Sequence, residues 1–531
     1  MRRFAPWLIA CSVGIVWLVL SPPSRNDLAG GDEGYYGTMA RNVLASRAQL
    51  VSPSLSPLGP PGDKPPLYPL LIAPFVRAWG AVPAAARAPS APCAALIAGG
   101  AGALVGMAAG PWTAAFATAL LATLPWFADA SRGAAAELPL TAFATLALLV
   151  LAVEPRSRAR AALAGVGLGL AFLCKLWLVA PAALAALALV ARRDRGALGV
   201  ATVLGGTALG VGALHLVAVA LLAPGAFAHW EYIYLGRSLV ERVRGEGYAD
   251  YWRQPPGMYW ALATRAFGLV LPFVVVGAEN AWRRRAEPVP RALLAWSAGL
   301  LLLSLFRVKA GGYAYVVMPA WAALAALGVD AIARGVRPSI GPLVAGAVLT
   351  SPLVSRFGAQ GLPAPAWAAV WVAAGALVWL TRLPKVPASR LAQSWALLAL
   401  GLGATRSAVR LSAAYHTPGY ERVAAAIAPR LSDVAPDQAC FVAPEAPTFA
   451  FHLFRTGRYW GTPIEPWSAG RAPALRDDPR LRVFIVDPTR SFYGGWPDSA
   501  TVRWLERETR EVTAEMPPGP HGERPLRVFV R

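Results

Sequence analysis

Long apolar segments recur through the first 411 residues and are separated by short polar loops. A membrane-spanning helix needs about 20 largely apolar residues, and fewer where helices are buried in a bundle. Thirteen segments fit: Phe4–Leu20, Pro89–Ala109, Thr113–Ala128, Leu138–Val153, Ala161–Cys174, Leu176–Ala191, Leu198–Leu222, Met258–Ala281, Ala292–Phe306, Tyr313–Ile332, Ile340–Val354, Trp367–Thr381 and Leu391–Leu411. Since 56% of residues are hydrophobic and the mean hydropathy is +0.46, an ordinary soluble globule is excluded. We predict a polytopic α-helical membrane domain over residues 1–411.

The charged residues predict the orientation of these segments. The net charge is +21, and basic clusters occupy every second loop, as at Arg156/Arg158/Arg160 and Arg283/Arg284/Arg285. Because cytoplasmic loops are enriched in Lys and Arg, this alternation puts the N-terminus in the cytoplasm. The same pattern argues against nucleic acid as a partner. We predict an uncleaved first helix, a bacterial inner membrane and an outer face that receives most of the acidic residues.

Residues 412–531 differ from the preceding part of the chain in having much shorter apolar runs. Apolar runs shorten to strand length at Cys440–Ala443, Val483–Val486 and Leu526–Val530, and helix-like stretches lie at Tyr420–Leu431 and Val502–Val512. This pattern predicts a small α/β domain outside the membrane, on the periplasmic face. The four cysteines and five histidines indicate no disulfide framework or metal-binding spacing.

The first outer loop, residues 21–87, carries two charged pairs. Asp32-Glu33 precedes an amphipathic stretch, Tyr35–Ala48, that reads as a helix lying along the membrane surface. Asp63-Lys64 lies between proline-rich turns that restrict the backbone. Asp32 could instead cap the helix, Glu33 could complement the helix dipole, and Asp63-Lys64 could be a solvated turn.

The other outer loops also place ionisable side chains near the membrane boundary. The chain has only four lysines, so Lys64, Lys175 and Lys309 could be present for their chemistry rather than for bulk charge. Carboxylates suit a general base or a metal, and cations suit an anionic leaving group such as phosphate. The remaining candidates are Asp129, Arg132, Glu137, Arg242, Arg307, Tyr313 and Tyr315. Interfacial snorkelling for Arg132 and a helix-start charge for Glu137 are the plain alternatives.

Taken in order, these motifs resemble the GT-C glycosyltransferases, and within them the branch of protein O-mannosyltransferases and bacterial aminoarabinose (lipid A) transferases. The resemblance rests on Asp32-Glu33, Asp63-Lys64-Pro65-Pro66, Ala86-Arg87-Ala88-Pro89, Arg132…Glu137-Leu138-Pro139-Leu140, the glycine-rich segment 165–175 ending in Lys175, and Lys309…Tyr313-Ala314-Tyr315…Pro319-Ala320. It runs through Pro319. The chain departs from the aminoarabinose transferases at Tyr35, where they have Arg, and at Asp63, where they have Glu.

The resemblance implies an inverting transferase that moves a sugar from a polyprenyl-phosphate donor to a hydroxyl of a lipid, glycan or protein at the outer face. Catalytic roles would fall to Asp32, Glu33 and Glu137. The donor phosphate would be bound by Lys64, Arg132, Lys175, Arg242 and Lys309, and the substrate pocket would be lined by Tyr35, Asp63, Tyr313 and Tyr315. A cofactor is not specified, and Asp32, Asp63 and Glu137 could hold a divalent cation.

Three other interpretations stay open. A transporter or flippase of a lipid-linked sugar would place ionisable groups mid-membrane, whereas here they gather at helix ends. A ligase-like transferase or a lipid phosphotransferase would use similar charges. A non-catalytic scaffold would need none of them, so loss of activity on removing Asp32 separates the enzymes from the rest.

Overall fold

A computed structural model describes residues 32–43, 46–54, 64–191, 195–245, 253–349, 351, 364–380, 388–412, 419–431, 440–443, 451–452, 465–466, 481–486, 499–518 and 526–531. Two compact units make up the chain. The first, here the helical unit, comprises Met1–Pro22, Ser90–Val217 and Ala228–Ala413; the second, here the mixed unit, comprises Pro23–Pro89, Ala218–Phe227 and Ala414–Arg531. The expected first span, Phe4–Leu20, and Asp63 lie outside the described residues. The predicted boundary at 411/412 stays a prediction.

The helical unit is built from apolar helices. They are α6 (Ser90–Ala109), α7 (Pro111–Thr123), α8 (Pro125–Ala130), α9 (Glu137–Val153), α10 (Arg158–Lys175), α11 (Ala180–Val190), α12 (Arg195–Leu222, which continues into the mixed unit), α15 (Met258–Phe267), α16 (Leu271–Arg283), α17 (Pro288–Ser304), α18 (Met318–Ala333), α19 (Ile340–Leu349), α21 (Ala364–Leu380) and α22 (Ala388–Ser412). Between α12 and α15 run α13 (Phe227–Glu231), the π-helix η3 (Tyr232–Glu241) and α14 (Arg242–Arg244).

Several of these helices are long and apolar enough to span a membrane. By length and composition, the described residues contain four helical stretches long and apolar enough to cross a membrane: Pro83–Ala109, Arg158–Val190, Gly196–Leu222 and Met258–Arg283. Shorter apolar helices include Glu137–Val153, Pro288–Ser304 and Met318–Ala333. Buried in a bundle, such shorter helices also suit a membrane domain. The count of thirteen spans stays a prediction.

Close helix packing holds the centre of this unit together. At the crossing of α16 and α18, a Cβ on Gly277 would lie 1.7 Å from the carbonyl oxygen of Leu324, and one on Gly328 would lie 2.1 Å from that of Phe273. Only glycine permits backbones to approach this closely. α18 is the most enclosed of these helices, since nearly all its residues are buried.

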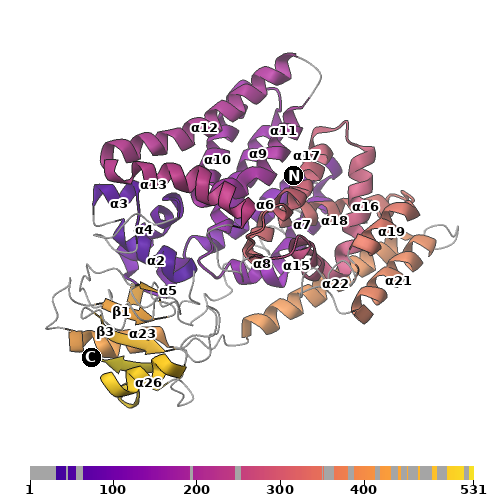
Figure 1. Cartoon of the computed structure of the whole chain (residues 1–531). Coiled ribbons are helices and arrows are strands. Elements are labelled where there is room, and N and C mark those ends of the chain that lie inside the picture. The colour runs from indigo at the N-terminus through magenta and orange to yellow at the C-terminus, as the bar shows by residue number, and fades with distance from the viewer. Residues whose placement is uncertain are drawn as a thin grey trace. The chain divides into compact units, whose positions relative to one another are not determined.

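The helical backbone geometry is interrupted between α10 and α11. Leu176 has φ 56° and ψ −134°, and among the described residues it alone has a positive φ without being glycine. The 3₁₀ turn η1 (Leu176–Val179) follows, and both α10 and α11 then pack against α9 (Figure 1). The prediction of two separate apolar segments, divided at Lys175, agrees with this break.

The mixed unit contains a five-stranded sheet with the strand order β2-β1-β3-β5-β4. Its strands are β1 (Cys440–Ala443), β2 (Glu465–Pro466), β3 (Leu481–Val486), β4 (Arg510–Glu511) and β5 (Arg527–Val530). β1 pairs in parallel with β2 and β3, whereas β5 is antiparallel to β3 and β4. Strands are thus present at each of the three predicted runs.

Alternation along β3 gives this sheet two covered faces. Val483 and Ile485 share a buried cluster with Tyr420 and Ile427 from α23 (Tyr420–Ile427). Phe484 points the other way, and its ring lies 5.5 Å from that of Trp504 in α26 (Ser499–Glu508). Figure 1 shows both helices beside the strands. Because successive side chains of β3 point to opposite faces, the strand packs against a helix on each face of the sheet.

The first-loop residues form four helices of the mixed unit: α2 (Asp32–Asn42), α3 (Arg47–Val51), α4 (Leu67–Trp79) and α5 (Pro83–Arg87). The expected continuous helix over Tyr35–Ala48 is wrong in extent, because α2 begins at Asp32 and ends at Asn42; its predicted place along the membrane surface stays a prediction. Eight of the eleven residues of α2 are buried. Tyr36 packs on Tyr68 of α4 at 4.9 Å, and a Cβ on Gly37 would meet the Phe451 ring at 3.0 Å. Contacts from distant parts of the sequence cover this helix, which its own pattern could not reveal.

Candidate active site

Several of the site residues predicted from the sequence lie in two groups, one in each unit. In the mixed unit, the first turn of α2 carries Asp32 and Glu33. Arg87, the last residue of α5, donates to both Glu33 carboxylate oxygens at 3.0 and 2.7 Å. Both side chains are buried, with 4% and 10% exposed. A bidentate buried pair of this kind fixes α2 against α5, and it occupies the Glu33 carboxylate.

Asp32 is the more accessible acid of the pair. Its carboxylate is 45% exposed, and Oδ1 lies 3.6 Å from Nζ of Lys64. The same ammonium lies 5.5 Å from the centre of the Tyr35 ring. The structure therefore gathers Asp32, Tyr35 and Lys64 in one place. Asp63 lies outside the described residues.

The second group lies in the helical unit and centres on an ion pair. Glu137 is the first residue of α9 and Lys175 is the last residue of α10. Nζ of Lys175 donates to Oε1 of Glu137 at 2.7 Å, with only 8% and 5% of the two side chains exposed. Each charge also complements the dipole of its own helix, since acids favour the N-terminus and cations the C-terminus. Leu176, whose positive φ is unfavourable for a residue with a side chain, follows directly.

Tyr313 brings further groups to this pair. It lies in the 3₁₀ turn η6 (Gly311–Val316), with Nζ of Lys175 5.6 Å and the Arg242 guanidinium 5.2 Å from its ring centre. Arg242 also donates a hydrogen bond to the Tyr313 hydroxyl. A Cβ on Gly312 would lie 2.8 Å from Oε1 of Glu137, so glycine lets the turn approach the carboxylate. Glu137, Lys175, Arg242 and Tyr313 form what is called here the Glu137 cluster.

Lys309 supports the loop beside this cluster. Its ammonium donates to the carbonyl oxygens of Phe306 and Gln254, the latter at 2.9 Å. The Arg242 carbonyl in turn accepts from the amides of Arg307 and Val308. Burial lowers the pKa of Lys309 to about 8. Lys309 thus joins its own segment to that of Gln254, and the amides of Arg307 and Val308 join it to Arg242. Its predicted contact with phosphate stays a prediction.

Arg132 and Tyr315 complete the predicted set. Nε of Arg132 is buried with no hydrogen-bond partner among the described residues, and burial lowers its pKa against the opposing pull of Asp129. The Tyr315 ring packs edge-on against Trp126 at 6.2 Å. Predicted binding roles for both residues remain predictions.

Two features were not singled out from the sequence. The pairing of Arg87 with Glu33 links residues 54 positions apart, although an arginine just before an apolar run was a usable signal. The His215 Nδ1 and the Tyr234 hydroxyl are 2.5 Å apart, and both rings pack against Trp230. A lone histidine inside the apolar segment 198–222 gives no spacing signal, so only the packing reveals this group.

Metal binding has limited support within the described residues, where no group of three or more His, Cys, Asp or Glu side chains could hold an ion. Of the acids considered, Glu137 is engaged by Lys175 and Glu33 by Arg87. The arrangement suits recognition of an anion beside a carboxylate.

Comparison with known proteins defines the class. Residues 63–226 match the family model for dolichyl-phosphate-mannose-protein mannosyltransferases. The fold is similar to that of ArnT from Cupriavidus metallidurans bound to undecaprenyl phosphate (TM-score 0.65, 18% identity, 98% of this chain and 97% of that one). It is also similar to the archaeal oligosaccharyltransferase AglB from Archaeoglobus fulgidus in complex with an inhibitory peptide and a dolichol-phosphate (TM-score 0.58, 13% identity, 92% and 69%). No curated protein gives a match.

The chain therefore has the fold of the GT-C glycosyltransferases and is an integral membrane protein. The resemblance to this superfamily and to its ArnT-like branch, predicted from the motifs, is confirmed.

Proposed function

We propose that this chain is a membrane glycosyltransferase that moves a sugar from a polyprenyl-phosphate donor to a hydroxyl of a lipid, glycan or protein acceptor. The family-model match carries the proposal, because residues 63–226 include Lys64, Arg87, Arg132, Glu137 and Lys175. Charged residues from both units thus lie in the stretch that matches this family model, whereas Asp32, Glu33, Arg242 and Lys309 lie outside it.

The donor class is supported by the fold relatives. One binds undecaprenyl phosphate and the other a dolichol-phosphate, and both ligands pair an anionic phosphate with a long isoprenoid tail. A lysine and an arginine around a tyrosine ring, as in the Glu137 cluster, suit a phosphate of this kind.

The reaction needs a base and an anion-stabilising group. An alcohol is a poor nucleophile at neutral pH, so a carboxylate takes its proton as the oxygen attacks the anomeric carbon. The bond from that carbon to the phosphate oxygen breaks, with inversion. The polyprenyl phosphate leaves with added negative charge, which cations offset in a partly dry site.

Roles follow from the contacts within each unit. We assign the base to Asp32, because its carboxylate is exposed enough to meet an acceptor. We assign binding of the donor phosphate to Lys175 and Arg242, and we include Arg132 and Lys309 as further phosphate-binding cations. Glu137 positions Lys175, and Glu33 positions the first turn of α2 through Arg87. The N-terminus is proposed to be cytoplasmic, with residues 412–531 on the outer face of a bacterial inner membrane.

A transfer assay in proteoliposomes tests the proposal. Purified full-length protein is given radiolabelled polyprenyl-phosphate sugars and membrane extract, in parallel with Asp32→Asn, Glu33→Gln and Glu154→Gln. Glu154 is a matched control because its exposed carboxylate pairs with Arg160 and follows the C-terminal end of α9, opposite Glu137.

We expect label transfer with wild type and Glu154→Gln, and a rate about 10²–10⁴-fold lower with Asp32→Asn. Glu33→Gln should lower the thermal stability as well as the rate, because it weakens a buried ion pair. Equal activity of wild type and Asp32→Asn would contradict the assignment of Asp32 as the general base. Absence of donor consumption by any form would contradict a transferase and favour transport of a lipid-linked sugar.

A further inference from the structure

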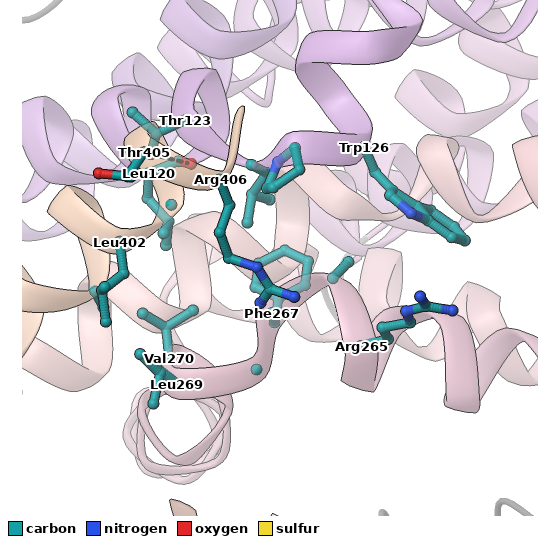
Figure 2. Close-up of a pocket in the computed structure, with 16 residues that line it drawn as sticks. Leu120, Thr123, Trp126, Arg265, Phe267, Leu269, Val270, Leu402, Thr405 and Arg406 are labelled. Carbon is teal, nitrogen blue, oxygen red and sulfur yellow. Dashed lines mark hydrogen bonds between the residues drawn. The ribbon is translucent and has the colours of Figure 1, made fainter. Parts of the chain in front are cut away.

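A cavity of about 480 Å³ lies in the helical unit between α7, α8, α15 and α22 (Figure 2). Most of its lining is apolar, including Leu120, Phe267 and Leu402. Two arginines, Arg265 of α15 and Arg406 of α22, also line it. Figure 2 shows the Arg406 side chain extending toward Phe267, with Arg265 on the Trp126 side of the cavity. Neither arginine belongs to the groups described above.

A second cavity, of about 800 Å³, continues from the first along α21 and α22. The two share Gly268, Leu269 and Arg406, so Arg406 lies at their junction. Beyond Arg406 the second cavity is almost wholly apolar and reaches Leu391. Fifteen helical residues separate these two positions, about 22 Å of axial rise, which exceeds half of the roughly 30 Å hydrocarbon core of a bilayer.

Together the two spaces match the shape of an amphiphile. The first offers two guanidinium groups, which bind phosphate in a bidentate manner. The second offers an apolar groove whose lining on α22 extends from Arg406 to Leu391. Both open toward the lipid-facing surface of these helices, since the lining residues Leu398 and Leu402 are 60% and 43% exposed.

The head compartment adjoins the Glu137 cluster through one aromatic contact. Trp126 lines the cavity and packs edge-on against Tyr315. A Cβ on Gly312 would lie 3.7 Å from the Tyr315 ring and 2.8 Å from the Glu137 carboxylate. A ligand that contacts Trp126 in this cavity would therefore be linked, through Tyr315, to the turn that contacts Glu137.

We propose that this paired cavity binds an anionic phospholipid of the surrounding bilayer, with its phosphate between Arg265 and Arg406 and a tail along α21 and α22. The bilayer is the source because the cavity opens on a lipid-facing surface, on which Leu397, Val372 and Trp379 are 67%, 72% and 60% exposed. The site is additional to the proposed donor-phosphate cations and does not depend on the transferase assignment. Bound lipid would stabilise the packing of α22 against α7 and α8.

Lipid titration of the purified full chain tests the proposal. Thermal unfolding in detergent is followed as phosphatidylglycerol is added, against phosphatidylethanolamine with the same tails and against inorganic phosphate. The variants are Arg265→Gln/Arg406→Gln, Ala373→Trp to fill the tail compartment, and Arg390→Gln. The last is a matched control, because Arg390 is an exposed arginine at the opposite end of α22.

We expect phosphatidylglycerol to raise the unfolding temperature of wild type and Arg390→Gln more than phosphatidylethanolamine does, and inorganic phosphate to have no such effect. The arginine double variant should bind phosphatidylglycerol about tenfold or more weakly. Ala373→Trp should weaken binding while both arginines remain. An undiminished preference for phosphatidylglycerol in the double variant would overturn the proposal.

Two further outcomes would also overturn it. If polyprenyl phosphate displaced phosphatidylglycerol from wild type at equimolar concentration, the cavity would be a carrier-lipid site. If inorganic phosphate alone reproduced the stabilisation, the tail compartment would have no role. Because these readouts need no sugar transfer, they are separate from the test of the transferase.

Discussion

At the scale of single residues, the buried ion pair of Glu137 and Lys175 has a structural role, and we propose that it also has a functional one. The pair is almost fully buried, and removing one partner of such a pair costs about 3–5 kcal/mol because the other charge is left uncompensated. Replacing both partners by neutral groups removes that penalty. Stability and activity should therefore respond differently to single and double substitution.

We predict that Glu137→Gln and Lys175→Met each lower the unfolding temperature and abolish transfer, whereas Glu137→Gln/Lys175→Met recovers most of the stability and stays inactive. Thermal unfolding and the proteoliposome assay measure the two effects, with Glu154→Gln, just beyond the other end of α9, as the control. Additive losses of stability in the double variant would contradict a coupled pair.

Lys309 provides a pH-dependent prediction. Burial lowers its pKa to about 8, so between pH 8 and the ordinary lysine value of about 10.4 the unfolded chain binds more protons than the folded one. Stability should rise with pH across that window. The difference in unfolding free energy between wild type and Lys309→Gln should therefore shift in favour of wild type from pH 8 to pH 10. A difference independent of pH would show that Lys309 keeps its ordinary pKa.

At the scale of helices and strands, the sequence predicted the type of secondary structure better than it predicted which elements pack against each other. The β-strands at Cys440–Ala443, Val483–Val486 and Leu526–Val530 match observed strands, because short apolar runs between turns leave few alternatives. Burial of α2 could not be predicted, since its cover includes Tyr68 and Phe451 from distant parts of the chain. The candidate site follows the same rule. Order along the chain suggested Lys175 and Glu137, whereas their 2.7 Å contact depends on how α9 and α10 pack.

The crossing of α16 and α18 is the element most sensitive to a small change. We predict that Gly277→Ala lowers the unfolding temperature, because its Cβ would lie 1.7 Å from a backbone carbonyl that cannot rotate away. Overpacking of this kind costs about 1–3 kcal/mol or more. Gly205→Ala in α12 is the matched control, since a Cβ there meets nothing within 4 Å. Equal unfolding temperatures for the two variants would mean that the helices separate without cost.

At the scale of the whole molecule, topology depends on whether α10 and α11 cross the membrane once or twice. As one straight helix, Arg158–Val190 would be 33 residues and about 50 Å long, well beyond the roughly 30 Å hydrocarbon core. The break at Leu176 and the packing of both helices against α9 instead favour a hairpin of two crossings. Together with α12, that places three crossings between Arg156 and Gly225, and so puts these residues on opposite faces.

We therefore predict that single cysteines at these two exposed positions, in a chain lacking its native cysteines, label differently in intact cells. A membrane-impermeant maleimide should react with Gly225→Cys directly and with Arg156→Cys only after the membrane is opened, as the arginine-rich loop at 156–160 requires. Labelling of both positions from the same side would mean an even number of crossings between them. In that case the 158–190 segment would be a single tilted helix, and Lys175 would lie within the membrane rather than at its outer boundary. Reaction of Arg156→Cys alone in intact cells would invert the whole orientation and move the proposed phosphate-binding cations to the cytoplasmic face.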